Sequence, residues 1–258
     1  MIKFFRHIRQ SMINQNRTKK YLLYAIGEIV LVVIGILIAL QINNWNEKRK
    51  ERVREHKYLN RLLNEIERDS SNLDWSIRLT SQKTKQAENL LKHFNTTIAI
   101  QDSSVFVNDA FLAGRGGSFY PNIHAYQELL ATGDVGIIQN ENITEQIARY
   151  IKRVEGFESF IYRDGETRRT KYNDHLHHYF SALIMNEIWK EDFGEYVELK
   201  VLNDLGIDIE GFIKDSNSAY HIRNMAALNL ELNRLYTQTM ERYILEILKE
   251  LRKELQLK

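Results

Sequence analysis

The chain of 258 residues contains no cysteine and a single proline, Pro121. Without cysteine it has neither disulfides nor thiol chemistry, so an oxidising compartment is permitted but not indicated. One proline is far below average usage and favours long, uninterrupted helices. Between Ile36 and Ala113 there is neither glycine nor proline, so nothing local ends a helix across that stretch.

Motifs of common catalytic and cofactor sites are also missing. The segment 114–118, GRGGS, lacks the Lys-Ser/Thr of a phosphate loop, and Gly-x-Ser-x-Gly does not occur. His175, His177 and His178 are close in sequence, but neither His-Glu-x-x-His nor Glu-x-x-His is present. A solvated or packed histidine cluster is therefore favoured over a zinc or di-iron site. We predict no cofactor, no bound metal and no catalytic residue.

Charge is unevenly distributed along the chain. Residues 1–20 carry six basic side chains and no acid, and residues 46–57 carry six basic and three acidic ones. The rest of the chain from Tyr58 onward has 24 basic and 30 acidic residues, a net charge of −6. An acidic domain preceded by basic segments argues against nucleic acid as a partner. It favours contact with anionic lipid, worth about 1 kcal/mol per Lys or Arg near the surface.

Between the two basic segments lies an apolar run of 21 residues, 22–42, LLYAIGEIVLVVIGILIALQI. At about 1.5 Å per residue it spans roughly 32 Å, the hydrocarbon thickness of a bilayer. Its 14 Leu, Ile and Val residues favour insertion by about 4 to 8 kcal/mol, against about 2.5 to 3.5 kcal/mol for one carboxylate. We predict a transmembrane helix over 21–45, with a basic interfacial segment over 1–20 and a helical bundle over 46–258.

The run is too long for a cleaved signal peptide and is followed by no small-x-small cleavage pattern, so it is expected to remain as an anchor. The flanking Lys and Arg counts tie at six each. The absence of acids before the run breaks the tie, and we predict a cytoplasmic N-terminus with the main domain outside the cytoplasm. Residues 1–13 place Phe4, Phe5 and Ile8 near one face, which predicts a short interfacial helix or, alternatively, a frayed basic tail.

Glu28 is the residue of the apolar run that most strongly suggests a functional site, because a carboxylate in a membrane span is a functional-site hypothesis by default. Glu28, Gly35 and Ala39 share one helical stripe, which includes a small-x-x-x-small packing surface. We predict that this stripe contacts another membrane helix, either a second copy or a partner. The alternative is a protonated Glu28 that reaches toward the headgroups.

After the membrane the first helix is expected to continue into the aqueous domain. Apolar or small residues recur there in alternating steps of three and four, which is typical of bundle packing. The hydrophobicity of this seam fades after Ile77, so packing on later helices of the same chain is favoured over a long parallel dimer. The seam consists of Leu59, Leu62, Ile66, Ser70, Leu73, Ile77, Thr80, Thr84, Ala87, Leu91 and Phe94.

The irregular region lies between residues 95 and 140. Asp102 is predicted to cap a helix through Phe111, and a helix over 123–131 is predicted to end at Gly133. Five of the twelve glycines fall between 114 and 136, so a binding loop is most expected here. Its candidate residues are Arg115, Ser118, Tyr120 and His124.

Three later helical stretches complete the expected bundle. One is capped by Asn140, begins at Glu141 and is kinked or ended by Gly165; another runs from Tyr172 through Ile188 to near Gly194; the last spans about 216–255. No alternation typical of hairpins is present. The chain is therefore predicted to be all-α, with the transmembrane helix continuous with an elongated bundle.

Two segments resemble a known family. The segment 20–47, KYLLYAIGEIVLVVIGILIALQINNWNE, resembles the N-terminal signature of an uncharacterised family of bacterial single-pass membrane proteins, and 126–140, YQELLATGDVGIIQN, is similar to its second motif. The resemblance implies a Gram-negative inner-membrane anchor with a helical domain, and it supplies no activity. We expect an interaction or scaffold protein rather than an enzyme, with a ligand-sensing bundle that signals through a membrane partner as the alternative.

Overall fold

A computed structural model describes residues 18–94, 98–116, 119–188 and 206–256. Over these ranges the chain is helical and has no β-strand, although an isolated antiparallel bridge pairs Phe180 with Ile207. The all-α prediction is confirmed. The helices, in which η marks a 3₁₀-helix (η1) or a π-helix (η2, η3), are α2 Thr18–Leu91, α3 Ser103–Ala113, α4 His124–Thr132, η1 Asp134–Ile137, α5 Glu141–Phe160, η2 Ile161–Gly165, α6 Glu166–Leu176, α7 Leu183–Ile188, α9 Ile209–Lys214, α10 Ser216–Thr239, η3 Met240–Ile244 and α11 Leu245–Gln256.

Helix α2 is 74 residues long and runs without interruption from the apolar run into the helical domain. This continuity was expected from the absence of glycine and proline, and it is confirmed. The chain divides into two compact units, Met1–Lys57 and Tyr58–Lys258, and α2 contributes to both. Its apolar part is long enough to cross a bilayer and is not buried in the protein.

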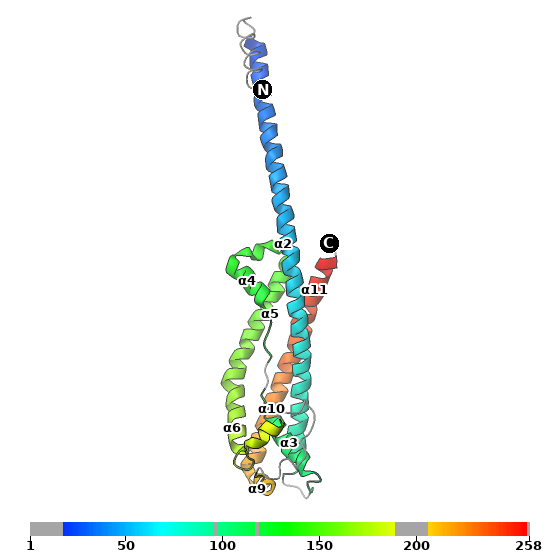
Figure 1. The fold of residues 1–258 in the computed structure, drawn as a ribbon, viewed down its shortest axis with the longest axis vertical. Coiled ribbons are helices and arrows are strands. Elements are labelled where there is room, and N and C mark those ends of the chain that lie inside the picture. The colour runs from blue at the N-terminus through cyan, green and yellow to red at the C-terminus, as the bar shows by residue number, and fades with distance from the viewer. Residues whose placement is uncertain (1–17, 95–97, 117–118, 189–205, 257–258) are drawn as a thin grey trace. The chain divides into compact units, whose positions relative to one another are not determined.

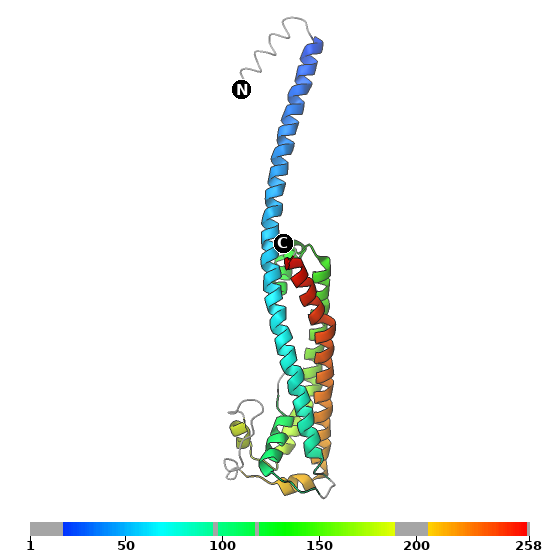
Figure 2. The ribbon, with the colours of Figure 1, turned by 90° about the vertical axis from the view of Figure 1, so that its right-hand side faces the viewer.

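The second unit is built from three long helical rods: α2 from Tyr58 onward, α5–η2–α6, and α10–η3–α11 (Figures 1 and 2). The third rod runs antiparallel to α2, because Asn233 Nδ2 donates to the Ile77 carbonyl at 2.8 Å while Arg252 pairs with Glu67 at 2.8 Å. It is also antiparallel to the second rod, since Asn140 Nδ2 donates to Glu254 near the end of α11. The second rod therefore runs parallel to α2.

The predicted seam of α2 packs into the core of its own chain, as expected. Each fully buried Leu or Ile contributes about 1.5 to 3 kcal/mol. Ser70, Ile77, Thr84 and Leu91 are half-buried and alternate with buried residues of the seam, so burial continues to Phe94 although the seam becomes less hydrophobic. The buried seam residues are Leu59, Leu62, Ile66, Leu73, Thr80, Ala87 and Phe94.

The short helices begin and end where local chemistry predicts. Asp102 caps α3, because its carboxylate accepts from the backbone N–H of Ser104 at 2.8 Å. Gly133 ends α4 with φ of 73°, a left-handed conformation in which glycine lacks the steric cost of a side chain. Helix α5 begins at Glu141 as predicted, although the side-chain amide of Asn140 contacts Glu254.

The prediction of one helical stretch from Tyr172 through Ile188 is wrong. Helix α6 ends at Leu176, and the chain turns so that Phe180, 1% exposed, enters the core. There its ring lies 5.1 Å from that of Phe212 and 6.1 Å from that of Phe111. Burial of this aromatic ring favours the turn over a continued helix. Gly194 lies outside the described residues, as does the predicted interfacial helix of residues 1–13.

The predicted kink at Gly165 corresponds to a π-helical turn, η2, rather than to the end of a helix. The backbone continues as helix on both sides, and Gly165 lies against Leu228 of α10. A second π-turn, η3, divides the last predicted helix into α10 and α11. Each π-turn holds one additional residue and shifts the face that the following helix presents.

Candidate functional site

Side chains of the three long rods bind backbone carbonyls at the end of α3 and in the glycine-rich loop that follows it. Lys83 of α2 donates through Nζ to the carbonyl oxygens of Arg115 and Gly116. The hydroxyl of Tyr172 on α6 donates to the Ala110 carbonyl, and Asn229 of α10 donates to that of Ala113 at 3.2 Å. Tyr172 and Asn229 thus satisfy carbonyls in the last turn of α3, where the helix itself supplies no donor, and Lys83 satisfies carbonyls of the loop.

The absence of a side chain at Gly114 allows the end of α3 to pack closely against Tyr172 and Asn173 of α6. A Cβ placed on Gly114 would lie 2.5 Å from the ring of Tyr172 and 2.9 Å from Oδ1 of Asn173. Its φ of −90° is open to any residue, so the requirement is for space rather than for conformation. An equivalent Cβ on Gly116 would meet nothing within 4 Å. The loop is therefore packed tightly at one glycine and loosely two residues later.

The electrostatics of this loop site are dominated by buried cations. Lys83 is 1% exposed, and burial together with the nearby charges of Arg169 and Arg115 lowers the pKa of its ammonium to about 7. Arg169 is 6% exposed and forms an ion pair with Glu166, while its Nε has no hydrogen-bond partner among the described residues. Burial, which is the largest cause, and the two positive groups all lower the pKa of Lys83.

The candidate binding-loop residues have different environments. Arg115 belongs to the loop site through its carbonyl, which Lys83 binds. Tyr120 is 58% exposed, and His124 is the exposed first residue of α4. Ser118 lies outside the described residues. Sequence analysis missed Lys83; the available signal was its spacing from Thr80, Ala87 and Leu90 along the buried face of α2.

A second buried polar cluster joins the start of α4 to α2. Asp69, 0% exposed, accepts from the Tyr150 hydroxyl at 2.7 Å and from the backbone and side-chain nitrogens of Asn122, both at 2.8 Å. Burial raises the pKa of Asp69, although these hydrogen bonds oppose the shift. One turn earlier, the Glu65 carboxylate accepts from the Ala125 backbone N–H at 3.0 Å. This cluster fixes the position of α4.

Of the three clustered histidines, only His175 packs between α6 and α10, whereas His177 and His178 are exposed just after the end of α6. His175 Nε2 lies 2.8 Å from Ser218 Oγ, and the rings of His175 and His221 are 4.8 Å apart. Burial lowers the pKa of both histidines, an effect that Asp215 opposes. Across the described ranges, no group of three or more His, Cys, Asp or Glu side chains is placed to hold a metal ion.

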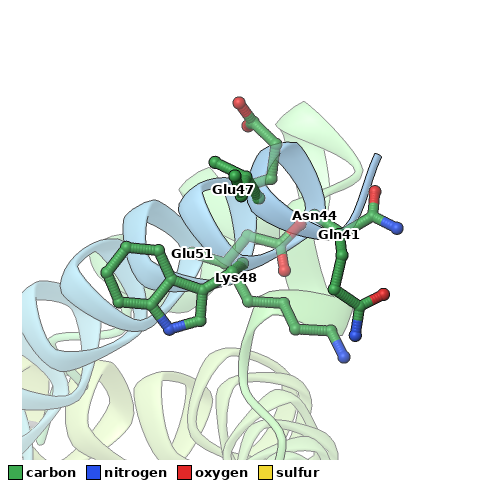
Figure 3. Close-up of a pocket in the computed structure, with 7 residues that line it drawn as sticks. Gln41, Asn44, Glu47, Lys48 and Glu51 are labelled. Atoms are coloured by element: carbon green, nitrogen blue, oxygen red, sulfur yellow. The ribbon is translucent and has the colours of Figure 1, made fainter. Parts of the chain in front are cut away.

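The membrane stripe lies on an open part of α2. Gly35 and Ala39 are exposed, Glu28 is partly exposed, and a Cβ on Gly35 would meet nothing within 4 Å. At the end of the apolar run, a shallow groove lined by both polar and apolar side chains follows the same helix, and Figure 3 shows Gln41 and Lys48 extending along one side of it. Trp45 in this groove is 67% exposed. Trp and Lys at this position are typical of a helix at a membrane interface.

Comparison with known proteins gives a family and no activity. No curated protein and no solved structure matches the chain. A family of unknown function, DUF6090, matches residues 28–192, a range that begins inside the apolar run and extends beyond α7. The match covers more than half of the chain, and the resemblance had likewise implied a family without known activity. The chain therefore belongs to the DUF6090 family of unknown function.

Proposed function

We propose that this chain is a single-pass membrane protein whose helical domain serves as an interaction or scaffold component of a bacterial inner-membrane assembly. The observation that carries the proposal is the exposure of the apolar run. All 14 of its Leu, Ile and Val side chains are between 46% and 72% exposed. Leaving so many apolar side chains in water would cost on the order of 20 kcal/mol, so lipid is the expected surrounding.

The proposed orientation places the N-terminus in the cytoplasm and the helical domain outside it. Because the chain lacks cysteine, single cysteines can be introduced at Ser11, Val33 and Ser81 and labelled with a membrane-impermeant maleimide. In intact spheroplasts we expect Ser81→Cys to react, Ser11→Cys to react only after permeabilisation, and Val33→Cys to react only in denaturing detergent. Labelling of Val33→Cys in native membranes, or recovery of the chain in the soluble fraction after carbonate washing, would refute the anchor. Reversed labelling of Ser11→Cys and Ser81→Cys would refute the orientation.

A helix contact within the membrane supports the scaffold role. Glu28, Gly35 and Ala39 lie on one face, whereas Val33 lies about 160° from Gly35 at roughly 100° per residue. We expect oxidative crosslinking of Gly35→Cys and Ala39→Cys to give adducts, either between two copies or with a membrane partner, and the matched Val33→Cys variant to give none. Equal crosslinking from both faces, or none from either, would refute this contact.

A ligand-sensing bundle is the second candidate function. It is supported by the loop site, in which Lys83 holds two loop carbonyls with a pKa near neutrality. The proposal assigns no catalytic activity to the chain.

A further inference from the structure

A hollow lies on the seam between α5 and α10, away from the loop site. Its apolar part is formed by Gly156, Phe157, Phe160 and Leu235, of which Phe157 is buried. Its volume of about 370 Å³ falls within the range of small-molecule sites. Arg153, Glu231 and Arg234 complete its lining.

Two π-turns flank this hollow. Phe160 directly precedes η2, and Leu235 lies about one turn before η3, which packs against α5. Figure 1 shows α5 and α10 as neighbouring rods of the bundle. A π-turn widens a helix locally and is frequent at functional sites. The hollow thus lies in regular helix, between the two points at which the rods depart from α-helical geometry.

The charged groups of the hollow favour an anion. The guanidinium of Arg153 lies 5.0 Å from the centroid of the Phe157 ring, and its buried Nε has no hydrogen-bond partner in the described part of the chain. Its recorded hydrogen bond, to Gln238 Oε1, is long at 3.3 Å. Among the residues that the structure describes, Arg234 forms no ion pair or hydrogen bond. Glu231 adds one negative charge and lies 3.5 Å from Arg168, whose closer partner is Asp164, so two arginines against one carboxylate leave a net positive charge at the hollow.

We propose that this hollow binds a small amphiphilic carboxylate. Its carboxylate accepts hydrogen bonds from Arg153 and Arg234, and its apolar body packs on Phe157, Phe160 and Leu235. Arginine suits this role because its guanidinium presents several donors in a fixed geometry that matches a carboxylate. The ligand places its negative charge beside two guanidinium groups and covers the part of the Phe160 side chain that is open to solvent. This site deepens the second candidate function, the ligand-sensing bundle, by naming the class of its ligand. Binding of the ligand does not depend on the membrane anchor.

The test uses the full chain in lipid nanodiscs and 4-phenylbutyrate as the probe, with binding measured by ligand-observed NMR against empty nanodiscs. We expect saturable binding, no binding of acetate, which lacks an apolar body, and at least tenfold weaker binding of the neutral 4-phenylbutanol. Replacement of either arginine, Arg153→Gln or Arg234→Gln, should weaken binding about tenfold, the loss expected for one charge-assisted hydrogen bond. Arg149→Gln, on the same helix but outside the hollow, is the matched control and should bind as the native chain does.

A second variant tests the position of the site by filling it. A Cβ on Gly156 would meet nothing within 4 Å, so Gly156→Leu should be tolerated in α5 and should abolish binding by occupying the hollow. Circular dichroism at 222 nm confirms that the variant is folded. The proposal is overturned if no saturable signal exceeds that of empty nanodiscs, or if binding survives both Gly156→Leu and the arginine substitutions. Binding that is independent of these variants indicates partition into lipid.

Discussion

The buried ammonium of Lys83 should make the free energy of unfolding of the bundle increase as the pH rises above about 7. Its pKa is about 7 in the folded protein, compared with about 10.4 in an unfolded chain. Between these values the unfolded chain binds the proton and the folded chain releases it. The free energy of unfolding therefore rises with pH in this window, and below about pH 7 the cost of burying the charge is present in full.

The magnitude follows from the two pKa values. Between pH 7 and pH 9 the occupancy of the folded ammonium falls from about one half to about one hundredth, while the unfolded lysine stays almost fully protonated. Integration over this range gives an increase of about 2 kcal/mol in the free energy of unfolding. Tyrosines whose pKa burial raises, such as Tyr150 and Tyr172, contribute little below pH 9, because an unfolded tyrosine titrates near 10.

Urea unfolding of the full chain in a non-ionic detergent, followed by circular dichroism at pH 7, 8 and 9, measures this effect. Lys83→Met removes the titrating group, so the difference in unfolding free energy between the native chain and the variant should change by about 2 kcal/mol over the range. Lys85→Met is the matched control, because Lys85 lies on the same helix and is exposed; its curve should stay parallel to that of the native chain. Parallel curves for Lys83→Met as well would refute a buried lysine with a depressed pKa.

Two further substitutions test the packing around the buried polar groups. Gly114→Ala should lower the free energy of unfolding by about 1 to 3 kcal/mol, because its Cβ would overlap the ring of Tyr172, whereas Gly116→Ala should change it by less than about 0.5 kcal/mol; equal effects of the two would contradict the tight approach. Tyr150→Phe should cost about 1.5 to 3 kcal/mol, since it removes a donor from the buried Asp69 carboxylate, with the exposed Tyr220→Phe as control. Both comparisons use urea denaturation at pH 7, and a Tyr150→Phe variant as stable as the native chain would argue against the Asp69 contact.

Much of the fold follows from local signals in the sequence. The uninterrupted α2 results from the absence of helix-breaking residues, and the limits of α3 and α4 follow from Asp102 and Gly133, whose effects act over one turn. The two π-turns were not predicted as such, because one additional residue in a helical turn has no compositional signature. The end of α6 was also missed, since it depends on Phe180 reaching aromatic partners far along the chain.

The buried polar residues were the least accessible to sequence reasoning. Lys83 and Asp69 lie on the inner face of α2, but apolar periodicity treats charged residues as outward-facing. Their partners are 32 and 81 positions away, at the Arg115 carbonyl and the Tyr150 hydroxyl. Only the folded chain brings these groups together. The glycine-rich segment was predicted to hold a binding loop, and no local pattern could indicate its charged environment, because that comes from distant helices.

The contacts between α2 and the α4 region constrain how the length of the chain can vary. Arg61, Glu65 and Asp69 lie four residues apart and bind Glu128, Ala125 and Asn122 in turn. An inserted or deleted residue within 62–68 would rotate some of these three side chains by about 100° around the helix relative to the others, so that all three contacts could not form together. Insertions in this part of α2 should therefore be rare among relatives of this protein, whereas substitutions at its outward positions should be common.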